Sequence, residues 1–259
     1  MIYESTVILS EAKNLNREDI IMKRILLMAV RCIFYLPRML FRLCRYAKHV
    51  DRYSEEERYA LLKDIVYHAN HAGRVTIKPY GVHNIPKENG FIFFPNHQGL
   101  YDVLAVLDVC PVPFSVVNKK EVANIPFLKQ VFACMKAYSI DREDLRQSMQ
   151  VIMNITKDVK QGRNFLIFPE GTRSKQGNKV FDFKGGSFKS ATKAKCPIIP
   201  IAIIDAYKAF DTSSIKKLTV QVHFLEPILY DEYKEMKTVE IAAMVKGRIE
   251  ETIEKYDKP

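Results

Sequence analysis

The sequence predicts an α/β protein in which a mixed β-sheet is covered by helices and preceded by an amphipathic helical membrane anchor. Short apolar runs alternate with longer segments that carry apolar residues at helical spacing. Polar motifs directly follow two of these runs, which is where α/β folds place their chemistry. A segment near the N-terminus combines regularly spaced arginines with apolar residues, and this pattern predicts the anchor.

Residues 1–21 are predicted to be a poorly structured or non-native extension. They are polar and mixed in charge, without the continuous apolar core or the cleavage site of a signal peptide. Met22 directly precedes the basic, apolar segment and is a candidate native start.

Residues 22–72 are predicted to form membrane-associating helices. Four arginines recur every seven residues and would form one stripe along a helix: Arg24, Arg31, Arg38 and Arg45. The longest charge-free run has six residues, whereas a membrane-spanning helix needs about 20. We therefore expect the segment to lie in the interface on the cytoplasmic face of a membrane, with the arginines on anionic headgroups and Pro37 splitting the helix. The alternative is a helix packed on the protein's own core, with a solvated basic side.

The remaining elements follow from capping signals and periodicity. Ser54 and Glu57 form a capping box that opens a helix over residues 54–71, with Gly73 as its stop. Further helices are expected at residues 102–110, 144–160, 187–195 and 238–256. Strands are expected at residues 74–79, 91–94, 165–168, 198–204 and 218–225. Residues 73–259 would then form the main domain.

Charge and cysteine content narrow the partners and the compartment. A net charge of +10 favours anionic partners such as phospholipid surfaces, phosphorylated small molecules, acidic carrier proteins or nucleic acid. Nucleic acid is disfavoured because no recognised binding module is present and the cations follow a membrane-like helix. The five cysteines form no CxxC pair, which indicates reduced, buried thiols in a cytosolic setting.

The first motif contains His97 and Asp102, which are candidates for a catalytic base and the carboxylate that orients it. Five residues apart on one regular helix they would point in different directions. They can meet if His97 lies in a loop and Asp102 lies in the first turn of the following helix. Asp102 would then fix the histidine tautomer and leave the other ring nitrogen free to take a proton. No serine or cysteine nucleophile has an obvious place beside the pair, so the base would act on a substrate hydroxyl. The alternative is a loop histidine beside a capping aspartate.

The second motif extends from Phe168 to Ser174 and predicts an anion-binding turn. Arg173 suits bidentate recognition of a phosphate, and Gly171 permits a tight turn beside Thr172. Glu170 is expected to support the arginine or to hydrogen-bond the substrate. Further cations that would add to the same site are Lys119, Lys120, Arg142 and Lys184. The alternatives are a surface salt bridge in a βα loop for Glu170 and Arg173, and solvated side chains for the isolated cations.

Two other chemistries are disfavoured. Catalysis by cysteine needs a thiolate in an accessible, electropositive place, whereas Cys110, Cys134 and Cys196 lie in apolar surroundings. A metal site built from His97, Asp102 and Glu170 lacks any HxxH, HExxH or CxxC element. We therefore predict no metal and no cofactor.

Together these residues resemble the glycerolipid acyltransferase superfamily, and most closely the bacterial lysophosphatidic acid acyltransferases (1-acyl-sn-glycerol-3-phosphate O-acyltransferases). Four ordered blocks carry the resemblance: His97 to Asp102, Lys119 to Arg142, Phe168 to Ser174, and Pro197 to Pro200. They lie within residues 76–204, about half of the chain. In the second block, residues 135–139 lack the glycine that the family usually has before its Ile-Asp-Arg sequence.

The resemblance implies that residues 73–259 are an acyltransferase domain and residues 22–72 a membrane anchor. It implies transfer of an acyl group from acyl-CoA or acyl carrier protein to the sn-2 hydroxyl of lysophosphatidic acid, giving phosphatidic acid. His97 and Asp102 would supply the base. Glu170, Arg173 and their cationic neighbours would bind the acceptor's phosphate.

The four blocks are shared across the superfamily, so other functions stay open. The acceptor alternatives are glycerol 3-phosphate, another lysophospholipid or a lipid A precursor. A non-catalytic, membrane-bound lipid-binding protein is a further alternative, although a binder has no need for an oriented base. The choice between acyl-CoA and acyl carrier protein, the chain-length preference and the oligomeric state are open as well.

Overall fold

The computed structural model describes residues 23–257, so the extension expected over residues 1–21 lies outside the described residues. A seven-stranded sheet forms the centre, in the order β1-β7-β6-β2-β5-β3-β4. Its strands are β1 (Val75–Tyr80), β2 (Ile92–Pro95), β3 (Ser115–Lys119), β4 (Tyr138–Ile140), β5 (Phe165–Leu166), β6 (Ile198–Ile204) and β7 (Leu218–Phe224). Neighbouring strands are parallel except β6 and β7. The predicted mixed sheet is therefore confirmed.

The central strands are apolar because both of their faces are covered. Every residue of β2 and β6 is buried. Phe93 of β2 pairs with Ile199 of β6 on one side and with Leu166 of β5 on the other. Parallel strands packed on both faces read as continuous apolar runs rather than as alternating patterns. These runs explain why the sequence predicts the sheet centre well.

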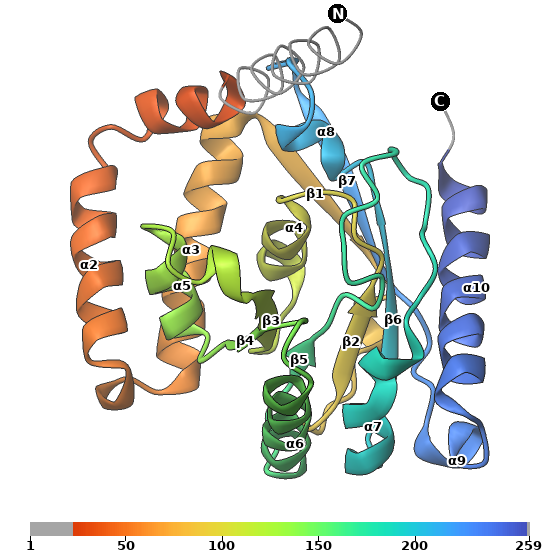
Figure 1. Ribbon diagram of the computed structural model, residues 1–259. Helices are drawn as coiled ribbons and strands as arrows, with labels where there is room; N and C mark the ends of the chain where they lie inside the picture. The colour runs from red at the N-terminus through yellow and green to blue at the C-terminus, as the bar shows by residue number, and fades with distance from the viewer. Residues whose placement is uncertain (1–22, 258–259) are drawn as a thin grey trace, which may run out of the picture.

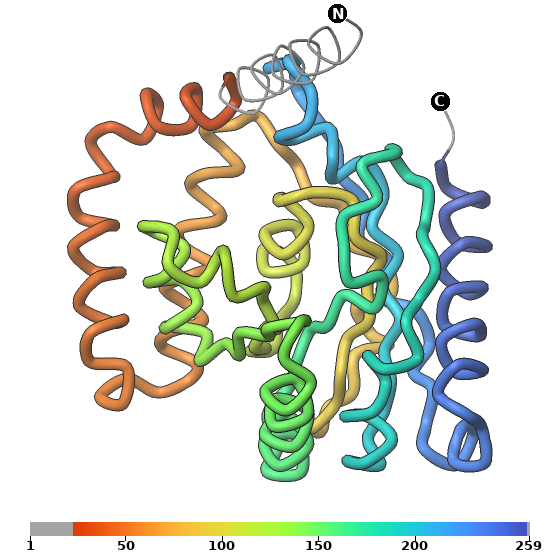
Figure 2. The backbone as a smooth tube through the Cα atoms, in the orientation of Figure 1, coloured from red at the N-terminus to blue at the C-terminus, as the bar shows by residue number. Residues whose placement is uncertain are grey.

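Helices cover the two faces of the sheet as separate layers (Figures 1 and 2). One face is covered by the helical residues 23–31 together with α2 (Leu36–Lys48), α3 (Glu55–Gly73), α4 (Asp102–Val109) and α5 (Leu128–Cys134). The other face is covered by α6 (Leu145–Lys160), α7 (Lys189–Ala194) and α10 (Thr238–Tyr256). Two short helices, α8 (Tyr207–Phe210) and α9 (Tyr230–Tyr233), lie in the connections around β7.

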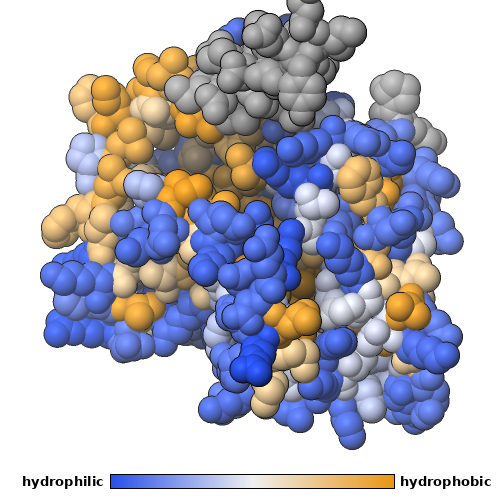
Figure 3. All heavy atoms as spheres, in the orientation of Figure 1, coloured by the Kyte–Doolittle hydropathy of each residue, from blue (hydrophilic) through white to orange (hydrophobic). Residues whose placement is uncertain are grey.

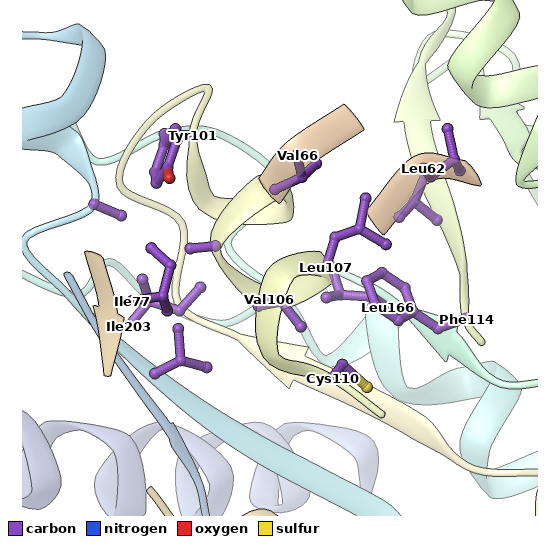
Figure 4. Packing of buried hydrophobic residues seen from close by; sticks show 14 of the residues in the cluster. Leu62, Val66, Ile77, Tyr101, Val106, Leu107, Cys110, Phe114, Leu166 and Ile203 are labelled. Carbon is purple, nitrogen blue, oxygen red and sulfur yellow. The ribbon is translucent and has the colours of Figure 1, made fainter. Parts of the chain in front are cut away.

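Each layer has its own apolar core. Figure 4 shows the first, in which Leu62 and Val66 of α3 gather with Leu107 of α4 and Ile203 of β6. A buried side chain of this size contributes about 1.5–3 kcal/mol to folding. The two cores hold the sheet rigid, so that its carboxyl edge is a fixed base for functional loops.

The predicted helix boundaries agree closely with the structure. The capping box is present, since Glu57 N donates to Ser54 Oγ (3.1 Å) and Ser54 N donates to Glu57 Oε2 (2.7 Å). Asp102 is the first residue of α4, and α10 has the predicted bounds. The sequence prediction lacked β3, β4, α5, α8 and α9, which have only three to seven residues each, and it made β5 two residues too long. Such short elements carry too few residues to show a period.

The N-terminal helices split as predicted but use their arginines differently. Residues 32–35 form a turn, and Pro37 lies in the first turn of α2. Arg24 is buried rather than facing headgroups, which corrects the expectation of one uniform stripe. Its guanidinium donates to the carbonyl oxygens of Gly73 (2.5 Å), Ser214 (2.7 Å) and Lys216 (3.1 Å). This side chain therefore ties the segment to the main domain.

Met28, Met39 and Leu43 of the segment are buried in the first core, whereas the other three arginines of the stripe are exposed. Arg31 is exposed although it donates to Ala72 O (2.9 Å), and Arg38 and Arg45 are exposed as well. Apolar side chains are also uncovered: Phe34 is 97% exposed and Phe41 is 68% exposed. Figure 3 shows orange side chains gathered on this side of the molecule, over α2 and the helix before it. Among residues 23–257, no helix is long and apolar enough to cross a membrane.

Candidate active site

The loop after β2 is held in place by side chains that continue the pairing of the sheet. Asn96 accepts from Ile203 N (2.8 Å) and donates to Ile203 O (3.0 Å), as a strand residue would. Gln98 donates to the same carbonyl (2.9 Å) and accepts from Ala206 N (3.0 Å). Both side chains are buried. They fasten the loop to β6 on either side of His97 and leave that residue little freedom.

His97 and Asp102 form the predicted pair, with the histidine in the loop and the aspartate at the start of α4. His97 Nδ1 lies 2.7 Å from Asp102 Oδ2. The same oxygen accepts from Gln98 N (2.7 Å) and Gly99 N (3.0 Å). Asp102 is fully buried, whereas the His97 side chain is 20% exposed. Since a carboxylate only accepts, Nδ1 carries the proton and Nε2 is left with its lone pair.

The turn after β5 lies directly against this loop. Ser174 N donates to His97 O (2.8 Å). The ring of Phe168 stacks on the imidazole, with ring centres 3.9 Å apart and an angle of 23° between the planes. The two motifs meet because β2 and β5 are parallel neighbours, so their carboxyl ends lie at the same edge. Phe168 therefore forms one wall beside the base.

Glu170 is turned into the protein, which corrects its expected place at the substrate phosphate. The residue is only 2% exposed. Its Oε1 accepts from His97 N (2.7 Å) and its Oε2 accepts from Phe181 N (3.2 Å). Burial raises the pKa of this carboxyl to about 7, although the two backbone donors act in the opposite direction. Glu170 thus links the second motif to the backbone of the histidine.

Arg173 of the second motif and Lys184 after it are both at least partly exposed. Arg173 is half-buried and Lys184 is exposed, and among the described residues neither side chain forms an ion pair. Gly171 has a φ of +70°, and a Cβ there would lie 3.1 Å from Lys184 Nζ. Lys184 N also donates to Pro169 O (2.9 Å). Lys184 therefore lies against the turn that carries Thr172 and Arg173.

Lys119 and Arg142 lie at the same edge of the sheet but further along it. Lys119 is the last residue of β3 and pairs with Ile140 of β4, two residues before Arg142. With strands about 4.8 Å apart, the ends of β3 and β4 lie about 10 and 14 Å from the end of β2. Lys119 forms an ion pair with Glu121 (2.7 Å), and Arg142 is exposed. These two cations form a rim around the site rather than its centre.

The cysteines take no part in this arrangement. Burial raises the pKa of Cys110 to about 11 and that of Cys134 to about 11, so both are thiols at neutral pH. Cys196 is buried as well, whereas Cys44 is exposed on α2, which corrects the expectation of buried thiols throughout. Within residues 23–257, no three His, Cys, Asp or Glu side chains are grouped so that they could hold a metal ion.

Sequence reasoning missed the residues that support the pair. Gln98 is inside the first motif, but its partners Ile203 and Ala206 are more than 100 residues away. The stacking of Phe168 depends on the pairing of β2 with β5. The amide of Gln98 beside the suspected base is a sequence signal for the first role, and no local signal indicates the second.

Comparison with known proteins extends over the same region. The family model described as acyltransferase matches residues 75–204, half of the chain. This chain belongs to the acyltransferase family. The match covers β1 to β6 and therefore includes both motifs and every cation of the rim.

Relatives of this acyltransferase include proteins named 1-acyl-sn-glycerol-3-phosphate acyltransferase. The one from Salmonella typhimurium is 30% identical over 168 residues, which are 64% of this chain and 68% of that protein. The one from Borreliella burgdorferi is 28% identical over 176 residues, 67% of this chain and 70% of that protein. The crystal structure of the 1-acyl-sn-glycerophosphate (LPA) acyltransferase PlsC from Thermotoga maritima has the same fold, with a TM-score of 0.73 at 22% identity. That likeness covers 95% of this chain and 98% of the other.

Proposed function

We propose that this acyltransferase transfers an acyl group from a thioester donor to the sn-2 hydroxyl of lysophosphatidic acid and so forms phosphatidic acid. The observation that carries the proposal is the contact of 2.7 Å between His97 Nδ1 and the buried Asp102. It leaves Nε2 as the basic atom of the ring. The names of the relatives favour this acceptor over glycerol 3-phosphate or another lysophospholipid.

The reaction needs one proton to be moved twice. Nε2 of His97 removes the proton of the sn-2 hydroxyl while its oxygen attacks the thioester carbonyl carbon. The tetrahedral intermediate collapses, the C–S bond breaks, and the imidazolium returns the proton to the leaving thiolate. Asp102 stabilises the imidazolium and keeps the ring oriented, a contribution of about 10²–10⁴-fold for general base catalysis. The thioester is already activated, so the reaction needs no cofactor or metal.

The anionic end of the acceptor is assigned to the turn after β5. Arg173 binds the phosphate, with Gly171, Thr172 and Lys184 beside it. An arginine suits this task because its planar fork can bind two phosphate oxygens. Lys119 and Arg142 on the rim attract the acidic donor or the headgroup from a distance. Glu170 acts on the reaction through the backbone of His97 and is a positioning residue.

The N-terminal helices are assigned to the cytoplasmic surface of a membrane. Phe34, Phe41 and Leu26 are exposed apolar side chains that would enter the interface. Arg38 and Arg45 would contact anionic headgroups, and Arg24 would not because it is buried. This placement lets a lipid acceptor reach the site from the membrane that contains it.

The base assignment is tested by replacing His97 with alanine and measuring phosphatidic acid formation from lysophosphatidic acid and acyl-CoA. We expect a loss of at least about 10²-fold in kcat in folded protein. The matched control is His83→Ala, because His83 is an exposed histidine in the loop before β2. Activity of His97→Ala within a few-fold of the control would overturn the assignment. Thiol release without phosphatidic acid formation would point to another acceptor.

The phosphate assignment is tested by Arg173→Ala, with the exposed Arg52→Ala as the control. Hydrogen bonds to a charged group contribute about 1.5–3 kcal/mol, so we expect the KM for lysophosphatidic acid to rise by about 10- to 100-fold. The KM for the donor should change little. An unchanged acceptor KM would place the phosphate elsewhere.

A further inference from the structure

The outward face of α6 carries apolar side chains that the protein leaves uncovered. Leu145 is 78% exposed, Met149 is 41% exposed and Met153 is 54% exposed. Residues four apart lie on the same side of a helix, so the three form one stripe. The opposite side of α6 buries Val151 and Ile155 in the second core. Figure 3 shows orange and pale orange atoms over α6 among blue ones.

The same face is cationic. Arg146, Lys157 and Lys160 are exposed around the stripe, and within residues 23–257 none of them forms an ion pair. The helix contains a single carboxylate, Asp158, whose side chain is 16% exposed and accepts from Arg163 and from Tyr138 (3.1 Å). A mixed surface of flexible methionines and unpaired cations suits an acidic helix with an apolar side.

The face begins close to the active site. α6 starts directly after β4, and its N-terminal cap Asp144 accepts from Arg146 N and Gln147 N. β4 is the third strand from β2 at the same edge of the sheet, so its carboxyl end lies about 14 Å from the loop of His97. A partner seated along α6 would present its own end at the rim formed by Lys119 and Arg142.

The face is also separated from the surface assigned to the membrane. The N-terminal helices pack on one side of the sheet, and α6 packs on the other (Figures 1 and 2). A flat bilayer in contact with Phe34 and Phe41 would therefore lie across the sheet from Met149 and Met153. This arrangement favours a soluble partner for α6.

We infer that the outward face of α6 is the docking surface for an acyl carrier protein, a small acidic protein that delivers the acyl chain as a thioester. The inference rests on the proposed function, since it names the donor of that same reaction. The apolar stripe supplies contact area and the cations supply charge complementarity. The carrier's thioester reaches His97 over the rim of the sheet.

The experiment compares two donors with the same acyl chain, acyl carrier protein and acyl-CoA. Two variants change the face by different means: Met149→Ser with Met153→Ser, and Arg146→Glu with Lys157→Glu. Both should lower kcat/KM for the carrier donor by about tenfold or more, as loss of interface contacts does, while kcat/KM for acyl-CoA stays within about twofold. The control is Lys87→Glu, an exposed charge reversal before β2 that should change neither donor.

Several outcomes would overturn the inference. Equal losses with both donors would assign the face to CoA or to structural support. Loss of binding to anionic vesicles in the methionine variant would assign it to a membrane, and a changed oligomeric state would assign it to a second copy. Direct titration of the full chain with acyl carrier protein separates docking from chemistry. Wild-type protein that binds the carrier but forms no phosphatidic acid with either donor would contradict the proposed function alone.

Discussion

The loop around His97 and the N-terminal helices differ in how their side chains are held. Those of the loop are fixed by hydrogen bonds, whereas large apolar side chains of the helices are exposed. In the loop, one oxygen of Asp102 takes three donors and both oxygens of Glu170 accept from backbone. In the helices, Phe34 is 97% exposed and Phe41 is 68% exposed. The groups of the loop are thus oriented by the protein itself, whereas the described residues leave this apolar surface uncovered. Variants in the first region should change turnover, and variants in the second should change association.

The largest expected effect is that of Asp102→Asn on turnover. An amide is neutral, so it cannot stabilise the imidazolium that forms when Nε2 takes a proton. We expect kcat to fall by about 10²–10⁴-fold with little change in vesicle binding. Steady-state assays of phosphatidic acid formation measure the first, and co-sedimentation with vesicles measures the second. The control is Asp182→Asn, whose side chain is 99% exposed. A kcat within about fivefold of the control would remove Asp102 from the mechanism.

The next effect tests the exposed apolar surface. Replacing Phe34 and Phe41 by serine removes two side chains that would be partly buried in lipid, at a cost of about 3 kcal/mol in total. Vesicle binding should fall by about 10²-fold. The kcat in detergent micelles should stay near that of wild type, because neither side chain is part of the loop around His97. The matched control is Tyr67→Ser, an aromatic residue of α3 that is 64% exposed. Equal losses of kcat and of vesicle binding would contradict the view that the N-terminal helices act in association and not in turnover.

Arg24 differs from the other three arginines of the N-terminal stripe, because it is buried and held by hydrogen bonds, as the side chains of the loop around His97 are. Arg24→Ala removes a buried guanidinium from the carbonyls of Gly73, Ser214 and Lys216. Leaving such groups without a donor should lower the free energy of unfolding by about 2–3 kcal/mol. Urea unfolding measures this free energy. Arg38 belongs to the same set of arginines seven residues apart, but it is exposed. Arg38→Ala should therefore change the free energy of unfolding by less than about 0.5 kcal/mol. Equal effects would mean that the two arginines share one environment.

These differences show which features a sequence can reveal. His97 and Asp102 are five residues apart and meet through one local turn, so their spacing predicts their contact. The partners of Arg24 are 49 to 192 residues away and belong to the end of α3 and the connection before β7. Periodicity describes the sides of an isolated helix, and it does not tell which side a distant loop will cover. The same reason explains Glu170, whose backbone donors come from two other segments.

The strands of the sheet also differ in how well the sequence predicts them. The buried runs that form β2 and β6 are visible because every position in them is apolar. β3 and β4 are short edge-side strands in which residues of intermediate exposure interrupt the pattern. Their pairing places Lys119 and Arg142 on the rim, and that position depends on strand order. The distance of these two cations from His97 therefore could not be predicted from the sequence.

The smallest expected effect is that of Glu170 on the pH dependence of stability. It tests how the loop around His97 is held. Burial raises the pKa of this carboxyl to about 7, above the value of about 4.3 expected in the unfolded chain. Between these values the folded protein binds more protons than the unfolded chain. The contribution of Glu170 to stability is therefore full below about pH 4 and is lost as the pH rises through about 7.

Glu170→Gln removes this titration, so its free energy of unfolding should decline less between pH 5 and pH 8 than that of wild type. The difference in slope should approach about 1.4 kcal/mol per pH unit at most. Urea unfolding at several pH values measures both proteins, with Glu226→Gln, at an exposed position after β7, as the control. The variant is also expected to be less stable at pH 8, because a glutamine side chain has only one oxygen for the two N–H groups of His97 and Phe181. Parallel curves for Glu170→Gln and wild type would mean that the carboxyl titrates near its ordinary pKa. The backbone of the base would then be held by an ordinary, fully ionised carboxylate, and its orientation would not depend on pH near neutrality.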